Sequence, residues 1–365
     1  MTRASMRAGA LAGLLTSALI TQAQNTAPVS PAATPTAPAA AAAGGAPAPQ
    51  PYVPVPGLRA GERVATVNAI PGVIAANAQW ELVWADFETA DGIIPTADGG
   101  VMFAQEQTDT IRKLAPDGRE YVVLRDTHAT GAVSQDASGR LFGVQRTCTD
   151  SARPFYQSCH ELSYVAQLLP EQRVLANSFA DGRPFGRLND VMADGKGGAY
   201  FTVGGAYHVS AAGAVTVVEN QNLVSNGILL SADGRTLWVT NTDRVIAFDV
   251  QPDGSTKNRR DFGTLDGDRG ADGMTIDSEG RLYVTASKGV HVLAKDGKYV
   301  GLIPTPRSPI TLTFAGAAKN ILYVPMMGVV GPDGKPWTTP QGVRNVGMSI
   351  YRIPMLSQGF AGRPK

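Results

Sequence analysis

Four side chains with oxygen donors stand at long intervals along the chain: Asp91, Asn189, Asn226 and Asp272. Three of them are followed directly by glycine. Carboxylate and amide oxygens are the donors that hard divalent cations such as calcium and magnesium prefer. A fold that brings these residues together would therefore create a candidate metal site. The alternative is that Asp and Asn simply cap and turn the entries of strands.

A short pattern that recurs six times predicts the elements that would position these residues. In each copy a turn leads into a run of β-forming residues, as residues 277–281 lead into residues 282–284. The runs begin at residues 101, 141, 199, 237, 282 and 322. Periods of about 40–50 residues with several short strands each indicate the blades of a β-propeller. The sequence therefore predicts an all-β fold, a six-bladed β-propeller with four-stranded antiparallel blades; an all-β sandwich is the alternative.

In a propeller the first strand of each blade lines the central channel, so equivalent positions at its start meet around the axis. Counting back ten or eleven residues from each second strand gives the six such positions: Asp91, Gly131, Asn189, Asn226, Asp272 and Thr311. The wider spacing between the second and third copies predicts an insertion in the second blade. We also expect residues 80–84 and 349–353 to pair in the last blade, because an open ring would leave strand edges unpaired.

The composition of the chain changes sharply near residue 57. Residues 1–23 contain two arginines and then an apolar run, which predicts a cleaved signal peptide and an exported protein. Residues 24–56 are rich in Ala and Pro and predict a disordered tether, and residues 57–365 form the predicted propeller. The 32 basic and 31 acidic residues are scattered without a basic cluster, which argues against nucleic acid as a partner. No second apolar segment suggests a transmembrane protein.

The two cysteines, Cys148 and Cys159, both fall in the predicted insertion. With a signal peptide in the same chain, a disulfide between them is the natural interpretation. A zinc site with the adjacent His160 is less favoured, because two thiols and one histidine at this spacing match no standard zinc pattern. A pair of free thiols is the third alternative.

Three short motifs resemble the signature of the gluconolactonase, regucalcin (senescence marker protein) and luciferin-regenerating-enzyme family. They are Arg187-Leu188-Asn189-Asp190, Ser225-Asn226-Gly227-Ile228 and Ala271-Asp272-Gly273-Met274. The resemblance extends from about residue 80 to about residue 330. It implies a six-bladed propeller that holds one divalent metal ion in its channel, and an enzyme that hydrolyses sugar lactones.

The resemblance also implies roles for individual residues. Asn226 and Asp272 match metal ligands of the family, and Arg187 and Asn189 match residues that contact substrate. The remaining family ligand is a Glu in a Glu-Gly-Pro motif, for which this chain has Asp91 followed by Gly and Ile. Glu88, three residues upstream, is an alternative ligand. Calcium or magnesium is expected first because all the donors are oxygens, although zinc or manganese can be accepted.

Hydrolysis of a lactone requires a water nucleophile and stabilisation of the negative charge that develops on the carbonyl oxygen. A metal ion can supply both, Asp272 can accept the proton of the water, and Arg187 can orient sugar hydroxyls or face the developing charge. The predicted function is therefore an exported, metal-dependent lactonase acting on a small molecule. A phosphotriesterase-like hydrolase and a non-catalytic propeller that binds a ligand or protein are the alternatives, since a fold alone does not decide function.

Overall fold

The structure is a computed structural model that describes residues 58–59, 61–149, 160–328, 338–339, 342–343 and 348–362. The described residues belong to one compact unit, residues 52–365. The predicted signal peptide, residues 1–23, and the predicted tether, residues 24–56, lie outside the described residues, so both assignments stay predictions. No helix in the described part of the chain has the length and apolar character needed to span a membrane.

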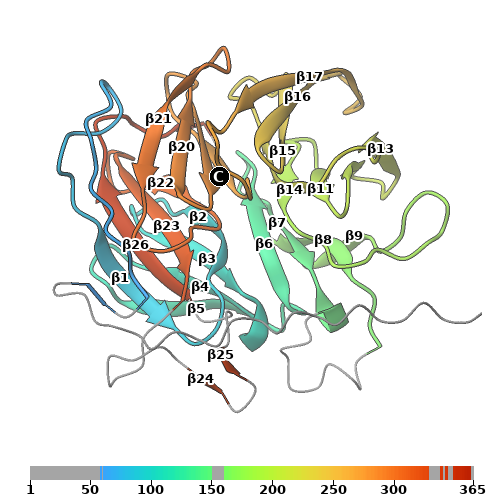
Figure 1. The fold of residues 1–365 in the computed structure, drawn as a ribbon. Helices are drawn as coiled ribbons and strands as arrows, with labels where there is room; N and C mark the ends of the chain where they lie inside the picture. The colour runs from blue at the N-terminus through green and yellow to red at the C-terminus, as the bar shows by residue number, and fades with distance from the viewer. Residues whose placement is uncertain are drawn as a thin grey trace, which may run out of the picture. The chain divides into compact units, whose positions relative to one another are not determined.

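Six four-stranded antiparallel sheets form the blades of a β-propeller, as predicted (Figure 1). The first blade contains β2 (Asp91–Pro95), β3 (Val101–Gln105), β4 (Thr110–Leu114) and β5 (Glu120–Arg125). The second contains β6 (Thr130–Gln135), β7 (Leu141–Gln145), β8 (Tyr164–Leu169) and β9 (Arg173–Ala176). The third contains β10 (Val191–Ala193), β11 (Ala199–Thr202), β12 (Ala206–Val209) and β13 (Val215–Glu219).

The remaining blades repeat this order. The fourth contains β14 (Ser225–Leu230), β15 (Thr236–Asn241), β16 (Arg244–Val250) and β17 (Thr256–Thr264). The fifth contains β18 (Met274–Ile276), β19 (Leu282–Ala286), β20 (Gly289–Leu293) and β21 (Tyr299–Pro304). The sixth contains β22 (Thr313–Ala315), β23 (Ile321–Met327), β26 (Met348–Pro354) and β1 (Glu81–Asp86). A separate two-stranded sheet pairs β24 (Thr338–Thr339) with β25 (Gly342–Val343).

The second strands begin within one residue of the predicted positions, because the turns before them have the chemistry expected from the sequence. In the fifth blade the side chain of Asp277 accepts hydrogen bonds from the backbone N–H groups of Glu279 and Arg281, each at 2.9 Å. Gly280 closes this turn with a φ of +83°, which favours glycine. The turn residues therefore fix the register of the hairpin.

The first and last strands close the ring together, which confirms the predicted pairing. β1 pairs antiparallel with β26, from Glu81 opposite Arg352 to Asp86 opposite Met348, and β26 pairs in turn with β23. Figure 1 shows β1, in blue, beside the red β26. Because the two ends of the propeller share one blade, no blade edge is left open at the junction.

The first strands of the blades contact one another in a closed circle. β2 contacts β6, β6 contacts β10, β10 contacts β14, β14 contacts β18, β18 contacts β22, and β22 returns to β2. The residues at the starts of these strands therefore face a common central channel.

The insertion in the second blade lies between β7 and β8, where the sequence predicted it. A short 3-10 turn, η2 (Thr147–Thr149), opens it. Cys159 lies outside the described residues, so the disulfide between Cys148 and Cys159 stays a prediction.

Candidate functional site at the head of the channel

The four oxygen-donor residues lie at the entries of the inner strands. Asp91 is the first residue of β2 and Asn226 the second residue of β14, whereas Asn189 and Asp272 lie two residues before β10 and β18. All four are half-buried, as expected for side chains that line a channel. The structure thus brings to one end of the ring residues that span more than 180 positions of the sequence.

The glycines that follow three of these residues allow neighbouring blades to approach one another. A Cβ atom on Gly92 would lie 2.4 Å from the Cα atom of Ala132 in the next blade. A Cβ atom on Gly227 would lie 2.2 Å from the carbonyl oxygen of Asp272. A Cβ on Gly273 would lie 2.7 Å from the Cα of Thr311. The glycine in each of these Asp-Gly and Asn-Gly pairs is therefore required by the close contact between inner strands, in addition to any turn that the pair forms.

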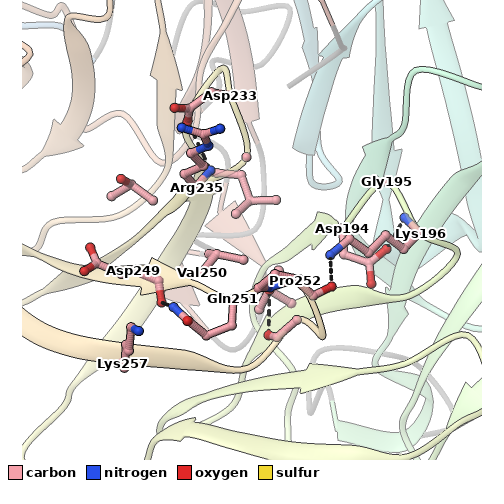
Figure 2. A pocket seen from close by; sticks show the side chains of 15 residues that line it. Asp194, Gly195, Lys196, Asp233, Arg235, Asp249, Val250, Gln251, Pro252 and Lys257 are labelled. Atoms are coloured by element: carbon pink, nitrogen blue, oxygen red, sulfur yellow. Dashed lines mark hydrogen bonds between the residues drawn. The ribbon is translucent and has the colours of Figure 1, made fainter.

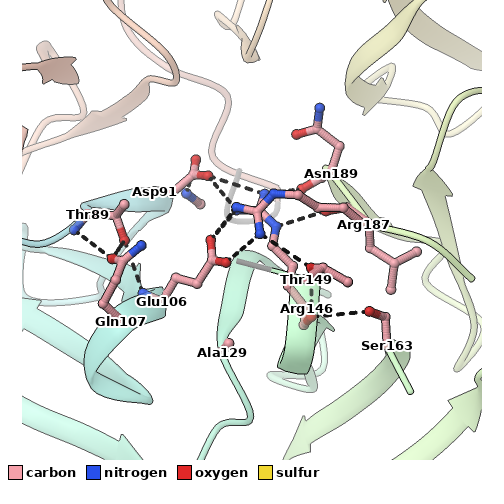
Figure 3. A network of polar contacts seen from close by, with 12 residues as sticks. Thr89, Asp91, Glu106, Gln107, Ala129, Arg146, Thr149, Ser163, Arg187 and Asn189 are labelled. Atoms are coloured by element: carbon pink, nitrogen blue, oxygen red, sulfur yellow. Dashed lines mark hydrogen bonds and ion pairs between the residues drawn. The ribbon is translucent and has the colours of Figure 1, made fainter. Parts of the chain in front are cut away.

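A network of ion pairs joins Asp91 to two residues that the sequence did not single out (Figure 3). The guanidinium of Arg146 donates to Glu106 Oε2 at 2.8 Å and to Asp91 Oδ2 at 3.3 Å. The Glu106 side chain is completely buried and that of Arg146 is 6% exposed. Charged groups are rarely buried to this extent unless they are paired.

Arg187, which the family resemblance places near substrate, binds the same carboxylate. Its Nη1 and Nη2 atoms donate to Glu106 Oε1 and Oε2 at 2.6 and 2.8 Å, which forms a bidentate pair. The Arg187 side chain is 44% exposed, unlike that of Arg146. Arg187 therefore has a fixed orientation while part of its side chain remains accessible.

Asp190 and Asp272 are two further acidic residues whose electrostatics are linked to Asp91. Burial raises the pKa of Asp272 well above its usual range, and the charges of Asp91 and Asp190 add to this effect. The charge of Arg146 and a hydrogen bond from Asn226 act in the opposite direction. Burial also raises the pKa of Asp91, against the opposing charge of Arg146. Asp91, Asn226 and Asp272 are thus part of one electrostatic cluster.

Asp190 is the third acidic member of this group and was not predicted as a site residue. Its carboxylate accepts the backbone N–H groups of Val191 at 2.8 Å and Ile228 at 2.9 Å. These bonds tie the entry of the third blade to the fourth. The sequence motif contained Asp190, but only the structure shows that its charge acts on Asp91 and Asp272.

Asn189 and Glu88 differ in how the structure places them. The backbone carbonyl of Asn189 accepts a hydrogen bond from Arg146 at 2.7 Å, so Asn189 belongs to the same neighbourhood. Glu88 is half-buried in the bend between β1 and β2. The charge of Glu106 acts on Asp91. Glu88 as a ligand stays a prediction.

Six ionisable side chains at the head of the channel form what we call the channel cluster, and their charges do not balance. Four carboxylates, those of Asp91, Glu106, Asp190 and Asp272, face two guanidiniums, those of Arg146 and Arg187. Ionisation of all six groups leaves two negative charges in excess, which a divalent cation would neutralise. Within the described residues no three acidic, histidine or cysteine side chains are arranged to hold an ion by themselves. Asp91 and Asp272 offer carboxylate oxygens and Asn226 offers an amide oxygen, which are the donor types that a hard cation prefers.

A separate cavity of about 720 Å³ lies between the third and fourth blades (Figure 2). The turns that line it follow the ends of β10, β14 and β16, whereas the channel residues stand at the beginnings of the first strands. Its charged lining residues are Asp194, Lys196, Asp233, Arg235, Asp249 and Lys257. Of the described residues that line this cavity, none belongs to the predicted site. The cavity is therefore distinct from the channel cluster.

Comparison with known proteins identifies sequence relatives of this chain. A gluconolactonase of Zymomonas mobilis is 23% identical over 280 residues, which are 67% of this chain and 78% of the relative. The lactonase drp35 of Staphylococcus saprophyticus is 36% identical over 138 residues, which are 33% of this chain and 42% of that protein. The match to drp35 therefore spans less than half of that lactonase.

A solved structure of a gluconolactonase from Xanthomonas campestris matches 82% of this chain and 98% of its own, with a TM-score of 0.59 and 18% identity. At this identity the likeness shows the fold alone. The model of the SMP-30/gluconolactonase/LRE-like region matches residues 129–327, which is more than half of the chain. The matched region contains the motifs around Asn189, Asn226 and Asp272, and the chain belongs to the SMP-30/gluconolactonase/LRE-like family.

Proposed function

We propose that this protein is an exported, metal-dependent lactonase that opens a sugar lactone or a related cyclic ester in the propeller channel. The observation that carries the proposal is the cluster of Asp91, Asp190 and Asp272, whose charges act on one another beside an exposed arginine. An excess of negative charge in a half-buried site is costly unless a cation compensates it. The names of the two curated relatives support lactones as the substrate class.

Asp91, Asn226 and Asp272 would hold the metal ion, with calcium or magnesium expected first and zinc or manganese as alternatives. A bound divalent cation supplies polarisation of the ester carbonyl and a lower pKa for a water molecule at the site. The donors belong to three different blades, and the glycines after them hold those blades in close contact. The rigid ring therefore fixes the positions of the donors before any ion arrives.

The remaining roles follow from the exposure and the partners of each side chain. Asp272 is the candidate general base, because its half-buried carboxylate lies among the side chains that would hold the metal ion and its water molecule. Glu106 accepts hydrogen bonds from two of the five N–H groups of Arg187, and Thr149 Oγ1 lies 3.4 Å from Nη1, so two N–H groups remain for substrate oxygens. Asn189 offers a short amide side chain at the channel wall for hydrogen bonds with substrate hydroxyls.

Metal analysis of the purified protein, followed by a pH-indicator screen over lactones with and without chelator, tests this function. We expect about one divalent ion per chain and acid release that stops when the ion is removed. Metal binding with hydrolysis of phosphotriesters alone would replace the substrate class, and metal binding without any hydrolysis would favour a non-catalytic binding protein. N-terminal sequencing of the protein from an extracytoplasmic fraction tests export, which a retained Met1 would contradict.

Replacing Asn189 with alanine should weaken substrate use more than metal binding. The side chain of Asn189 is removed, while Asp91, Asn226 and Asp272 keep their donors. We expect KM to rise about tenfold with little change in metal affinity, because a contact made equally in ground and transition states affects KM first. Steady-state kinetics and calorimetric metal titration measure the two effects. If metal affinity fell by the same factor as KM rose, Asn189 would instead be assigned to the metal site.

Replacing Asp91 with glutamate should preserve or improve metal binding, since it restores the family residue. The added methylene extends the carboxylate beyond its present contact with Arg146, which at 3.3 Å is longer than the 2.8 Å bond between Arg146 and Glu106. Calorimetry with calcium and with magnesium compares the variant with the wild type. A large loss of affinity for both ions would show that the shorter side chain is required in this channel.

A further inference from the structure

Arg146 is the most extensively bonded side chain of the channel cluster. Its Nε atom donates to the carbonyl oxygen of Leu188 at 2.8 Å, and Nη2 donates to that of Asn189 at 2.7 Å. Nη1 binds Glu106 Oε2 at 2.8 Å, and both Nη atoms lie 3.3 Å from Asp91 Oδ2. A guanidinium has five N–H groups, and these five contacts use all of them.

The partners of Arg146 come from two other blades. Asp91 and Glu106 belong to the first blade, and the two carbonyl groups belong to the segment that enters the third. Arg146 itself follows the last residue of β7 in the second blade. One guanidinium therefore links three consecutive blades at the head of the channel (Figure 3).

Gly131 provides the space that this guanidinium occupies. A Cβ atom on Gly131 would lie 2.0 Å from Arg146 Cζ and 2.1 Å from its Nη1 atom, which is far inside van der Waals contact. Gly131 is the second blade's counterpart of the positions held by Asp91, Asn226 and Asp272 in other blades. In the second blade, therefore, the guanidinium of Arg146 fills the place where those blades present a side chain of their own.

We propose that Arg146, seated against Gly131, is the positioning residue for the segment of residues 187–189, which presents the substrate-binding side chains. It holds the backbone of this segment through the two carbonyl groups, and it holds Arg187 indirectly by binding the same Glu106 carboxylate. The proposal rests on the proposed function only in assigning substrate to this segment. The positioning itself is a property of the backbone.

Variants of Arg146 separate this role from simple charge balance. Arg146→Met removes the charge and every hydrogen bond. Arg146→Lys keeps the charge beside Asp91 and Glu106 but lacks the planar fork that reaches two carbonyl groups as well. Gly131→Ala leaves Arg146 in the sequence and displaces its guanidinium. A positioning role predicts that all three variants loosen residues 187–190, whereas a role in charge balance alone predicts that the Lys variant behaves as the wild type.

Hydrogen exchange of the backbone amides provides the direct measurement. In the wild type the amide of Asn189 is bonded to the Thr202 carbonyl at 2.8 Å, and that of Asp190 to the Thr202 hydroxyl at 3.0 Å. We expect exchange at these two amides to be about tenfold faster in all three variants, as local opening becomes easier. Calorimetric metal titration should show an affinity equal to or higher than that of the wild type for Arg146→Met, because a positive charge beside Asp91 is removed.

Two matched variants provide the controls. Arg140→Met removes an ion pair with Asp136 in the same blade, outside the channel. Gly186→Ala adds a methyl group next to the segment, where no atom lies within 4 Å. Both should show wild-type exchange at Asn189 and Asp190.

Wild-type exchange at these amides in folded Arg146→Lys and Gly131→Ala proteins would overturn the proposal, even if activity fell. If Arg146→Met does not fold, these two variants still decide the matter. With an active lactonase, KM should rise at least about tenfold more than kcat falls in Arg146→Lys. If the wild type hydrolyses no lactone, the proposed function fails, while the exchange measurement still tests the positioning role.

Discussion

Replacing Asp272 with alanine should lower lactone hydrolysis about a thousandfold or more while the propeller remains folded. The change removes a metal donor and the candidate general base together. The fold should survive because burial and the charges of Asp91 and Asp190 oppose the ionised form of Asp272, so its carboxylate is held in place at the expense of stability. A lactone assay beside calorimetric metal titration measures both losses, and thermal unfolding reports the fold.

Two further variants make this result specific. Asp272→Asn retains an oxygen donor but cannot accept a proton, so it should keep more metal affinity than Asp272→Ala while losing comparable activity. Asp296→Ala removes an acidic residue from an exposed turn of the same blade and should be indistinguishable from the wild type. Equal metal affinity and equal activity in Asp272→Ala and the wild type would remove Asp272 from the site.

The sequence predicts the propeller well because its repeats reflect interactions between residues that are close together in the chain. Five of the six turns before a second strand combine an acidic side chain with a glycine, and these interactions act within a few residues, as the bonds of Asp277 show. Ring closure could be predicted for a different reason, since a sheet edge left open at the junction is unfavourable. Both inferences depend on backbone hydrogen bonding, which is general to β-sheets.

The positions around the channel axis could also be predicted, but their environment could not. Counting along the repeats identified Asp91, Asn226 and Asp272 because equivalent positions in a ring must meet. The same count gave Gly131 without indicating that a guanidinium from the end of the next strand would fill its place. Contacts of this kind depend on the length and direction of individual side chains, which a repeat pattern does not specify.

One signal in the sequence could have identified the missing residues. Glu106 and Arg146 each follow the last residue of a second strand, and the residue before each is a glutamine, Gln105 or Gln145. In both blades the charged residue therefore stands at the same place in the repeat. Opposite charges at equivalent positions of neighbouring blades predict an ion pair at the channel head, and the observed distance of 2.8 Å between Arg146 and Glu106 agrees.

Replacing Glu106 with glutamine should destabilise the propeller strongly. The completely buried carboxylate pairs with Arg146 and with Arg187, so its loss leaves guanidiniums without their main counter-charge. Breaking a buried pair by removing one partner costs about 3–5 kcal/mol of unfolding free energy. Urea denaturation at neutral pH measures the difference. Glu81→Gln is the matched control, because the Glu81 side chain is 60% exposed in its pair with Arg352 and should cost less than about 1 kcal/mol.

The pH dependence of this difference distinguishes a lost charge from altered packing. Burial by itself raises the pKa of Glu106, but the charges and hydrogen bonds of Arg146 and Arg187 outweigh it and hold the pKa below the ordinary 4.5. The unfolded chain therefore binds the proton more readily than the native protein does. The stability contributed by Glu106 is present above that ordinary value and is lost as the pH falls through the lower, native pKa. The difference between the wild type and Glu106→Gln should accordingly shrink when denaturation is repeated toward about pH 3. A difference that stays constant over this range would mean that the glutamine disturbs packing at the channel head, and that the ion pairs of Glu106 contribute little to the stability of the ring.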